Sequence, residues 1–249
     1  MSPLLATDRL TVRFGDFVAV RNLSLTVAAE TVHAVIGPNG AGKTSLFNAI
    51  SGFVKPAAVR IRLCGDDIAG KPPNELARRG LARSFQICSI FPNLSVTDNV
   101  RMALMHDVTG LRLLRARATG EASHQEADAL IASAGLAAEA GRSAAELPYG
   151  RRRLLELVTT VALKPKILLL DEPTSGLARE DIPPVIALIR RVAESCGILM
   201  VEHNLGVVQS LANTVTVMAE GAVLCEGTYG EVARDERVMK AYLGVTGHA

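Results

Sequence analysis

The segment from Gly37 to Thr44, GPNGAGKT, combines three glycines with a lysine and a threonine in the spacing of a phosphate-binding loop. Glycines leave the space in which backbone N–H groups converge on phosphate oxygens, and the start of a helix adds unpaired donors and partial positive charge. Lys43 would bring a positive charge to the β- and γ-phosphates of a nucleotide, and Thr44 would offer its hydroxyl to Mg²⁺. The run Thr31–Ile36 before the segment predicts a strand and Thr44–Ser51 predicts a helix, which disfavours a chance glycine-rich turn. The predicted contacts of the nucleotide in this loop are Gly37, Pro38, Asn39, Gly40, Ala41, Gly42, Lys43, Thr44 and Ser45.

A second group of reactive side chains follows the uninterrupted apolar run Ile167–Leu170, which predicts a buried strand. Asp171 would lie at the carboxyl end of that strand, where open α/β sheets bind their ligands. There Asp171 can hold Mg²⁺ through water, and the adjacent Glu172 can polarise an attacking water. Two carboxylates at a strand end would, on their own, more simply cap a helix. Because a phosphate-binding loop precedes them in the same chain, a hydrolytic site is favoured.

Short apolar runs and helical segments alternate along the chain, which predicts an α/β fold with a parallel sheet and crossover helices. A mostly helical insert is predicted over residues 96–141, where Ala, Leu, Arg and Glu dominate. His33, inside the run Thr31–Ile36, is expected to be a buried strand residue and not a ligand. Further strands are predicted at Leu10–Phe14, Phe17–Val20, Leu23–Val27, Ile61–Cys64, Ile198–Val201 and Thr214–Met218, a turn at Gly65–Asp67, and helices at Pro183–Val192 and Tyr229–Leu243.

Composition excludes several other classes of protein. The 249 residues are 49% apolar, so a disordered chain is excluded, and 27 basic against 25 acidic residues give a formal charge of +2. A charge so nearly balanced argues against a nucleic-acid coat or a polybasic membrane anchor. The four cysteines show no CxxC spacing, which disfavours a disulfide framework or a zinc site. No signal peptide and no apolar window of membrane-spanning length is expected.

Taken in order along the chain, these motifs resemble the nucleotide-binding subunit of an ABC transporter. Phe14 in VRFG resembles the aromatic residue that stacks on adenine, and Gln86 in RSFQ resembles the glutamine that senses the γ-phosphate and Mg²⁺. The segment Leu147–Arg151, LPYGR, occupies the position of the signature motif before a helix. Ser175–Ala178 lies at the D-loop of the family, and His203 in VEHN lies at its switch histidine.

The resemblance implies a P-loop ATPase of the ABC type, formed by residues 1–249 as a single domain. Its mainly parallel central sheet would carry a small antiparallel β subdomain and an inserted helical subdomain at approximately residues 94–157. It implies ATP and Mg²⁺ as cofactors, with the metal near Thr44, Gln86 and Asp171. Catalysis would fall to Glu172, His203 and Gln86, and Phe14, Tyr149 and Gly150 would add to the nucleotide contacts.

A finer resemblance, to ATP-binding subunits of branched-chain amino-acid uptake systems, rests on the strings GPNGAGKTSLFNAISGF, RSFQ, LPYG, VEHN and AYLG. It implies transmembrane permease subunits and a second ATP-binding subunit as partners, and a periplasmic or extracellular solute-binding protein as an indirect one. The location implied is the cytoplasmic face of the membrane, peripherally bound, with no nucleic-acid partner. Ile87, Ile90 and Phe91 would form an apolar docking surface for the permease, the alternative being a locally buried turn.

Three features depart from the wider family. Pro148 replaces the signature serine and has neither a hydroxyl nor an N–H, and Ala178 replaces the D-loop aspartate. The segment Lys55–Arg60 lacks the glycines usual at its turn, so a distorted first hairpin is expected. Three alternatives stay open: an importer of amides or urea, whose subunits carry similar strings, a soluble ABC-type ATPase of DNA repair or translation, and a nucleotide-dependent switch, which only Pro148 and Ala178 support. Three arginines, Arg151–Arg153, follow the signature segment and are expected to be solvated or to face an interface.

Overall fold

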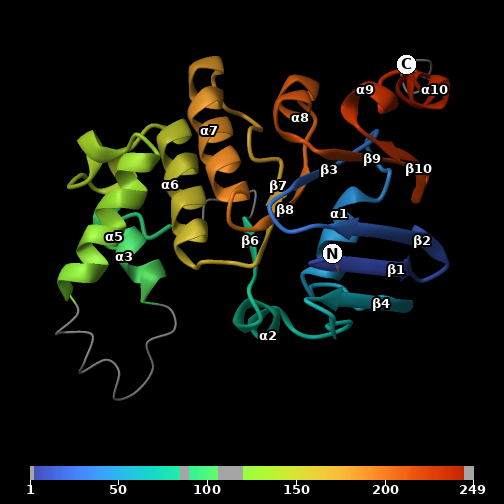
Figure 1. Ribbon diagram of the computed structural model, residues 1–249, viewed down its shortest axis with the longest axis horizontal. Coiled ribbons are helices and arrows are strands. Elements are labelled where there is room, and N and C mark those ends of the chain that lie inside the picture. The colour runs from blue at the N-terminus through green and yellow to red at the C-terminus, as the bar shows by residue number, and fades with distance from the viewer. Residues whose placement is uncertain (1–2, 85–89, 106–119, 244–249) are drawn as a thin grey trace. The chain divides into compact units, whose positions relative to one another are not determined.

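The computed structural model describes residues 3–84, 90–105 and 120–243 (Figure 1). The chain divides into two compact units. The first unit comprises residues 1–83, 166–175 and 193–249, and the second comprises residues 84–165 and 176–192. Among the described residues, no helix is both long and apolar enough to span a membrane.

A six-stranded sheet has the order β10-β9-β3-β8-β7-β6. The pairs β3–β8, β3–β9 and β7–β8 are parallel, and β9–β10 is antiparallel. Every residue of β3, β7 and β8 is buried, which explains why these strands read as continuous apolar runs. The loops that follow them leave the same edge of the sheet. The strands are β3 Val32–Ile36, β6 Leu81–Ser84, β7 Ile167–Asp171, β8 Gly197–Val201, β9 Thr214–Ala219 and β10 Ala222–Gly227.

A four-stranded antiparallel sheet has the order β2-β1-β4-β5. Its strands are β1 Leu5–Phe14, β2 Phe17–Val27, β4 Ala58–Leu63 and β5 Asp66–Asp67. The two strands predicted at Phe17–Val20 and Leu23–Val27 form one strand. An irregularity at Asn22, which takes a positive φ of 47°, shifts the register against β1 while the strand continues. The predicted turn at Gly65–Asp67 likewise ends in β5, whose two residues pair with β4.

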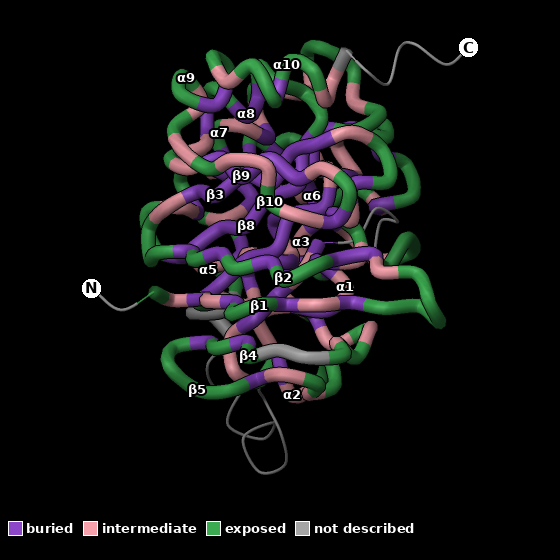
Figure 2. Tube along the Cα trace, turned by 90° about the vertical axis from the view of Figure 1, so that its right-hand side faces the viewer, coloured by how far each residue is buried: buried purple, intermediate pink, exposed green. Residues whose placement is uncertain are grey.

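Helix α1 shares one apolar core with both sheets. Its residues Leu46, Phe47 and Ile50 are buried, and Figure 2 shows buried residues along the strands of the two sheets. The predicted helix Tyr229–Leu243 is two helices, because the Asp235 carboxylate accepts the Arg237 N–H and starts a new one. The helices of the first unit are α1 Lys43–Ile50, α2 Pro73–Arg78, α8 Leu205–Leu211, α9 Tyr229–Val232 and α10 Glu236–Leu243.

The second unit is helical over its described residues. Helix α3 begins at a Ser95 cap that accepts the Asp98 N–H at 3.0 Å, and α7 covers the helix predicted at Pro183–Val192. The helices of this unit are α3 Val96–Leu104, α5 Gly120–Ser133, α6 Tyr149–Ala162 and α7 Ile182–Ala193, with the 3₁₀ helices η1 Ala137–Glu139, η2 Ala144–Glu146 and η3 Arg179–Asp181.

Candidate functional site

The phosphate-binding loop joins β3 to α1, as the sequence predicts. Gly37, Gly40 and Gly42 all have positive φ, at 151°, 80° and 98°. A Cβ added to Gly37 would collide with the Met218 carbonyl oxygen, and one added to Gly42 would collide with that of Ala19. These two glycines are therefore required by the close packing of the loop on β9 and β2. At Gly40 an added Cβ would meet nothing within 4 Å, so the loop is open there.

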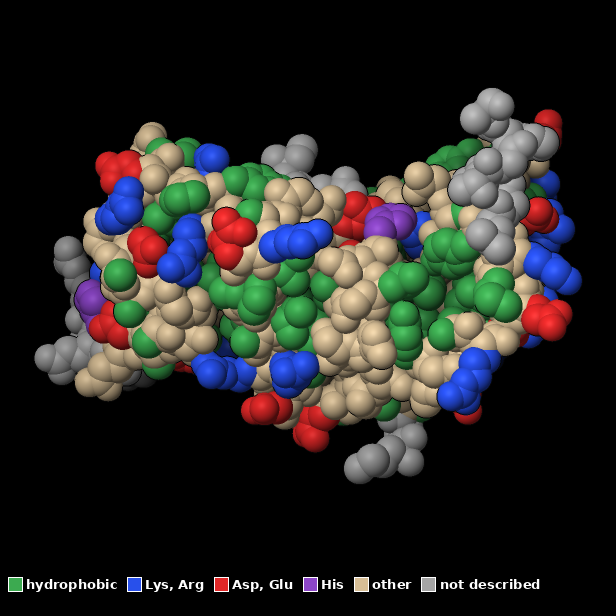
Figure 3. All heavy atoms as spheres, turned by 90° about the horizontal axis from the view of Figure 1, so that it is seen from above, with side chains coloured by type: hydrophobic (Ala, Val, Ile, Leu, Met, Phe, Trp, Pro, Cys, Tyr) green, Lys and Arg blue, Asp and Glu red, His purple; other side chains and the backbone are tan. Residues whose placement is uncertain are grey.

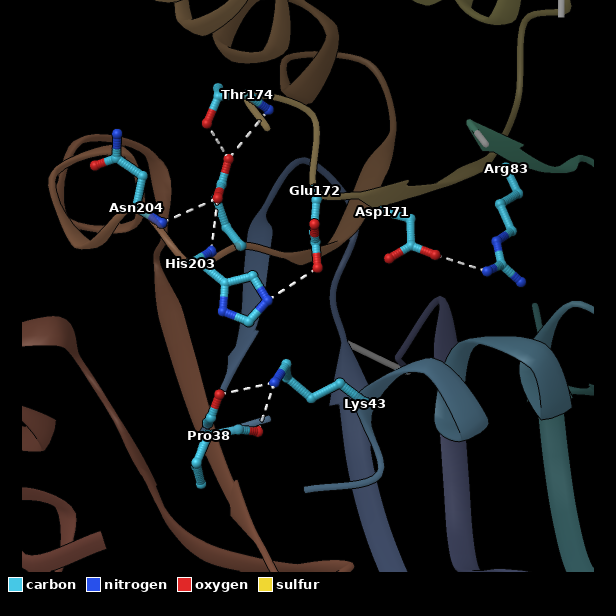
Figure 4. A network of polar contacts seen from close by, with 10 residues as sticks. Pro38, Lys43, Arg83, Asp171, Glu172, Thr174, His203 and Asn204 are labelled. Carbon is cyan, nitrogen blue, oxygen red and sulfur yellow. Dashed lines mark hydrogen bonds and ion pairs between the residues drawn. The ribbon is translucent and has the colours of Figure 1, made fainter. Parts of the chain in front are cut away.

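Lys43 folds back over this loop (Figure 4). Its ammonium donates to the carbonyl oxygens of Gly37 at 2.7 Å and Pro38 at 2.9 Å. Burial lowers the pKa of Lys43, and the negative charge of Glu172 acts in the opposite direction. Thr44 is exposed and Ser45 is half-buried in the first turn of α1. The fold thus brings the lysine and the acidic strand end to the same edge of the sheet.

Asp171 is paired with an arginine that the sequence reasoning did not single out. Arg83 Nη2 donates to Asp171 Oδ2 at 2.7 Å, and both side chains are less than a tenth exposed. Arg83 Nη1 donates to Asn48 Oδ1 at 2.8 Å and to Ser51 Oγ at 2.7 Å, at the end of α1. The guanidinium also lies 5.7 Å from the ring centre of Phe47, within cation–π range. Its only sequence signal is a charge in the short run LARS of β6.

Glu172 and His203 face each other across the site (Figure 4). His203 Nε2 lies 2.9 Å from Glu172 Oε1, and the His203 side chain is 44% exposed. Glu172 has a positive φ of 49°, a conformation that non-glycine residues adopt at a cost and that clusters at functional sites. Its N–H is fixed by the Val201 carbonyl at 2.9 Å, which holds the start of this turn against β8.

Phe14, at the end of β1, is 50% exposed and does not belong to the core. It pairs with Phe17 across a tight turn, and Phe17 is 67% exposed. Gln86 lies outside the described residues. Its contacts therefore stay a prediction.

The signature segment lies in the second unit. Pro148 occupies the N-cap of α6, and Tyr149 and Gly150 are its first residues. The Tyr149 ring packs within van der Waals distance of the position that a Cβ on Gly176 would take. A Cβ on Gly150 would overlap the Asp181 carboxylate, which would have to turn away to admit a larger residue. Sequence reasoning missed Asp181, because its position opposite Gly150 appears only in the fold.

The three arginines after the signature segment do not form one solvated face. Arg153 is 2% exposed and donates to Glu156 at 2.7 Å, so the prediction of a solvated or interface position is wrong for it. Arg151 pairs with Glu139 at 3.3 Å. Figure 3 shows both basic and acidic side chains on the face that it draws.

Two of the three residues predicted to form the docking surface for the permease are among the described residues. Phe91 is 55% exposed and Ile90 is half-buried, whereas Ile87 lies outside the described residues. The buried Asn99 fixes this turn: its Oδ1 accepts the Phe91 N–H at 2.7 Å, and its Nδ2 donates to the Phe91 carbonyl at 3.0 Å. A buried asparagine in α3 thereby presents an exposed aromatic residue.

The oxygen donors near the loop fit Mg²⁺. Thr44 is exposed at the start of α1, and Asp171 ends β7 at the same sheet edge. Mg²⁺ is usually held by one or two carboxylates together with substrate phosphates and water, not by a cage made wholly of protein. Consistent with that, no group of three or more His, Cys, Asp or Glu among the described residues is placed to hold a metal ion.

Comparison with known proteins identifies the family of the chain. The family model described as "ABC transporter" matches residues 20–175, and one described as "Branched-chain amino acid ATP-binding cassette transporter" matches residues 222–248. The high-affinity branched-chain amino acid transport ATP-binding protein BraF of Pseudomonas aeruginosa is 34% identical, with 97% of this chain and 98% of the relative covered. Its counterpart LivG of Escherichia coli K12 is 35% identical at the same coverage.

Solved structures are similar over nearly the full length. A nucleotide-free ATP-binding cassette from an ABC transporter has a TM-score of 0.82 and 27% identity, covering 97% of this chain and 99% of that one. The ADP conformation of an ATP-binding cassette has a TM-score of 0.83 and 27% identity, covering 98% and 100%. The chain belongs to the ABC transporter family, as one of its ATP-binding cassettes.

Proposed function

We propose that this chain is the ATP-binding and ATP-hydrolysing subunit of a membrane importer for branched-chain or other hydrophobic amino acids. The observation that carries the proposal is the meeting of Lys43, Asp171, Glu172 and His203 at one edge of the parallel sheet. The names of the relatives BraF and LivG support branched-chain amino acids as the class of solute. We further propose that residues 1–249 act as one ATPase domain, with the helical subdomain at about residues 94–157.

In this proposal the loop from Gly37 to Ser45 binds the phosphates and Phe14 stacks on adenine. Glu172 polarises the attacking water and accepts its proton. His203 contacts the γ-phosphate and stabilises negative charge in the transition state. Its side chain is 44% exposed, so a phosphate could reach the ring from solvent. A Mg²⁺ ion held by Thr44, Asp171 and Gln86 would neutralise charge on the β- and γ-phosphates.

The proposed partners follow from the family. Two ATP-binding subunits, equal or different, would meet head to tail, with ATP between one phosphate-binding loop and the partner's signature segment. Tyr149 and Gly150 keep their N–H groups at the start of α6, so that segment can bind an anion despite Pro148. Membrane subunits would dock at Phe91, and a solute-binding protein would act through them. The subunit would thus work at the cytoplasmic face of the membrane.

The experiment uses the full chain purified with its membrane subunits. We expect Glu172→Gln to keep affinity for a fluorescent ATP analogue and to lower phosphate release by at least about a hundredfold, the usual range for a general base. Uptake of labelled leucine in vesicles should fall in parallel. Unchanged turnover would refute Glu172 as the base, whereas active hydrolysis with uptake of urea or amides alone would correct only the solute.

A further inference from the structure

Glu202 is a buried carboxylate to which the proposed chemistry gives no role. It lies between Val201, the last residue of β8, and His203, and it is 3% exposed. An ionised carboxylate at such a depth is costly unless donors satisfy it. Its contacts therefore indicate what the residue is for.

Each oxygen of Glu202 accepts hydrogen bonds from a different segment of the site. Oε1 accepts the Thr174 N–H at 3.1 Å and also the Thr174 hydroxyl. Oε2 accepts the backbone N–H groups of His203 at 2.6 Å and Asn204 at 3.0 Å. All four partners donate to it, as suits a group that only accepts. Thr174 is itself buried at 6% exposure.

The carboxylate therefore links the turn after β7 to the turn after β8. Glu172, in the first turn, and His203, in the second, are the two side chains that meet at 2.9 Å. Asn204 continues the arrangement, since its Oδ1 caps α8 by accepting the Gly206 N–H at 3.0 Å. His203 is consequently held between a buried strand and a capped helix, with Glu202 fixing its backbone.

We infer that Glu202 is a positioning residue that aligns His203 with Glu172, an inference that rests on the function proposed above. It touches neither nucleotide nor water in that scheme and acts through the two turns. Replacing it by glutamine keeps the shape but substitutes an NH₂ donor for one accepting oxygen, so one turn loses its anchor and buried donors lose their partner.

The test is a double-mutant cycle on the full chain purified with its membrane subunits, using Glu202→Gln, His203→Ala and the double variant. We expect Glu202→Gln to lower kcat by roughly tenfold to a hundredfold, as misplacing a reacting group does, with KM and affinity for a fluorescent ATP analogue unchanged. Because both residues act as one unit, Glu202→Gln should add no further loss in the His203→Ala background.

Losses that multiply in the double variant, or an unchanged kcat for Glu202→Gln, would overturn the inference. If His203→Ala alone leaves kcat unchanged, the proposed role of His203 fails, and the positioning role fails with it. Thr174→Val provides a second variant if Glu202→Gln does not fold, because it removes only the hydroxyl donor. It should lower kcat in the same non-additive way, and additivity there counts equally against the inference.

Glu226→Gln is the matched control. Glu226 also accepts a threonine hydroxyl, that of Thr216 at 2.6 Å, but it lies on β10. Removing its charge should leave kcat and KM unchanged. If Glu226→Gln lowered kcat as much as Glu202→Gln does, the loss would not depend on the position of Glu202 between the two turns. That result would overturn the specific role of Glu202.

Discussion

Every charged side chain identified in the first unit's site already has a charged or polar protein partner. Lys43 is bonded to two carbonyls of its own loop, Asp171 to Arg83, and Glu172 to His203. Such pairing keeps buried charges from being left uncompensated. A nucleotide that binds here must therefore replace some of these internal contacts. Single substitutions at these positions should change both the stability of the free protein and its affinity for nucleotide, and the two effects can be measured separately.

The pair of Arg83 and Asp171 gives a prediction about stability. Arg83→Met should lower the free energy of unfolding by about 3–5 kcal/mol, because it removes the guanidinium that pairs with the buried Asp171 carboxylate. Arg83→Lys should recover only part of this, since a lysine cannot reproduce the fork that reaches Asn48, Ser51 and Asp171 together. Urea unfolding of the full chain measures both.

The double variant Arg83→Met with Asp171→Asn is the control, because it removes both charges. It should be more stable than Arg83→Met alone. If the double variant loses as much as the sum of the two single ones, the ion pair is not what stabilises this region.

The residues that the sequence predicts correctly are those whose place in the fold follows from a short motif around them. Lys43 in its loop and Asp171 at its strand end lie where spacing predicts them, although their roles remain proposals. Arg83, Glu202 and Asp181 could not be predicted, because each meets a residue that is distant in the chain only once the fold has formed. Arg83 and Asp171, for example, are 88 residues apart.

At the scale of elements, three neighbouring strands share a polar network around the buried His33. His33 on β3 is 2% exposed, as predicted for a buried strand residue. Its Nδ1 contacts the Thr26 carbonyl at 2.9 Å, and its Nε2 contacts Thr216 Oγ1 on β9 at 2.7 Å. Thr216 in turn donates to Glu226 on β10, which lies 3.7 Å from the His33 Nε2. The order β10-β9-β3 thus brings one histidine and one carboxylate together.

This network predicts a pH-dependent stability. Burial lowers the pKa of His33 below its ordinary value of 6.5, while Glu226 opposes that shift. Below about pH 6.5 the unfolded chain therefore binds a proton at this histidine more readily than the folded chain does. The contribution of His33 to the free energy of unfolding is complete above that pH and is lost as the pH falls below it. Unfolding free energies at about pH 8 and pH 5.5 should differ more for the wild type than for His33→Asn. An equal pH dependence in both would contradict the assignment.

The first turn of α6 gives a second prediction for an element. Gly150→Ala should lower the free energy of unfolding by no more than about 1 kcal/mol, because its Cβ overlaps only the end of the Asp181 side chain, which can turn away, and alanine favours the helix. Asp181→Ala in the same chain should relieve most of that cost. Thermal unfolding of the two single variants and the double variant provides the measurement, and a double variant no more stable than Gly150→Ala would contradict the contact.

The sequence predicts which segments are helices and strands better than it predicts where each of them begins and ends. The strands β3, β7 and β8 were predictable because burial on both faces makes them continuously apolar. Strand β6 was not, since it is only four residues long and carries Arg83, whose charge is neutralised by a distant residue. Strand β10, at the edge of its sheet, is only partly buried and has no clear alternation.

At the scale of the whole molecule, the chain passes between the two units close to the site residues. One passage lies between residues 83 and 84, next to the arginine that holds Asp171. Another lies between residues 175 and 176, directly after the turn that Glu202 anchors through Thr174. Two of the four covalent connections between the units therefore lie next to residues of the candidate site. Such placement suits a protein in which nucleotide turnover must be communicated to another subunit.

That communication needs a surface on the second unit, and Phe91 is the candidate, because the buried Asn99 holds its turn while its ring is 55% exposed. Phe91→Ser should leave affinity for a fluorescent ATP analogue unchanged and should reduce co-purification of the membrane subunits, measured from detergent extracts. Met239→Ser, which removes a comparably exposed apolar side chain from α10, is the control and should not affect co-purification. Asn99→Ala should weaken co-purification as Phe91→Ser does, because the turn loses the side chain that shapes it. Full recovery of the membrane subunits with both variants would place the docking surface elsewhere.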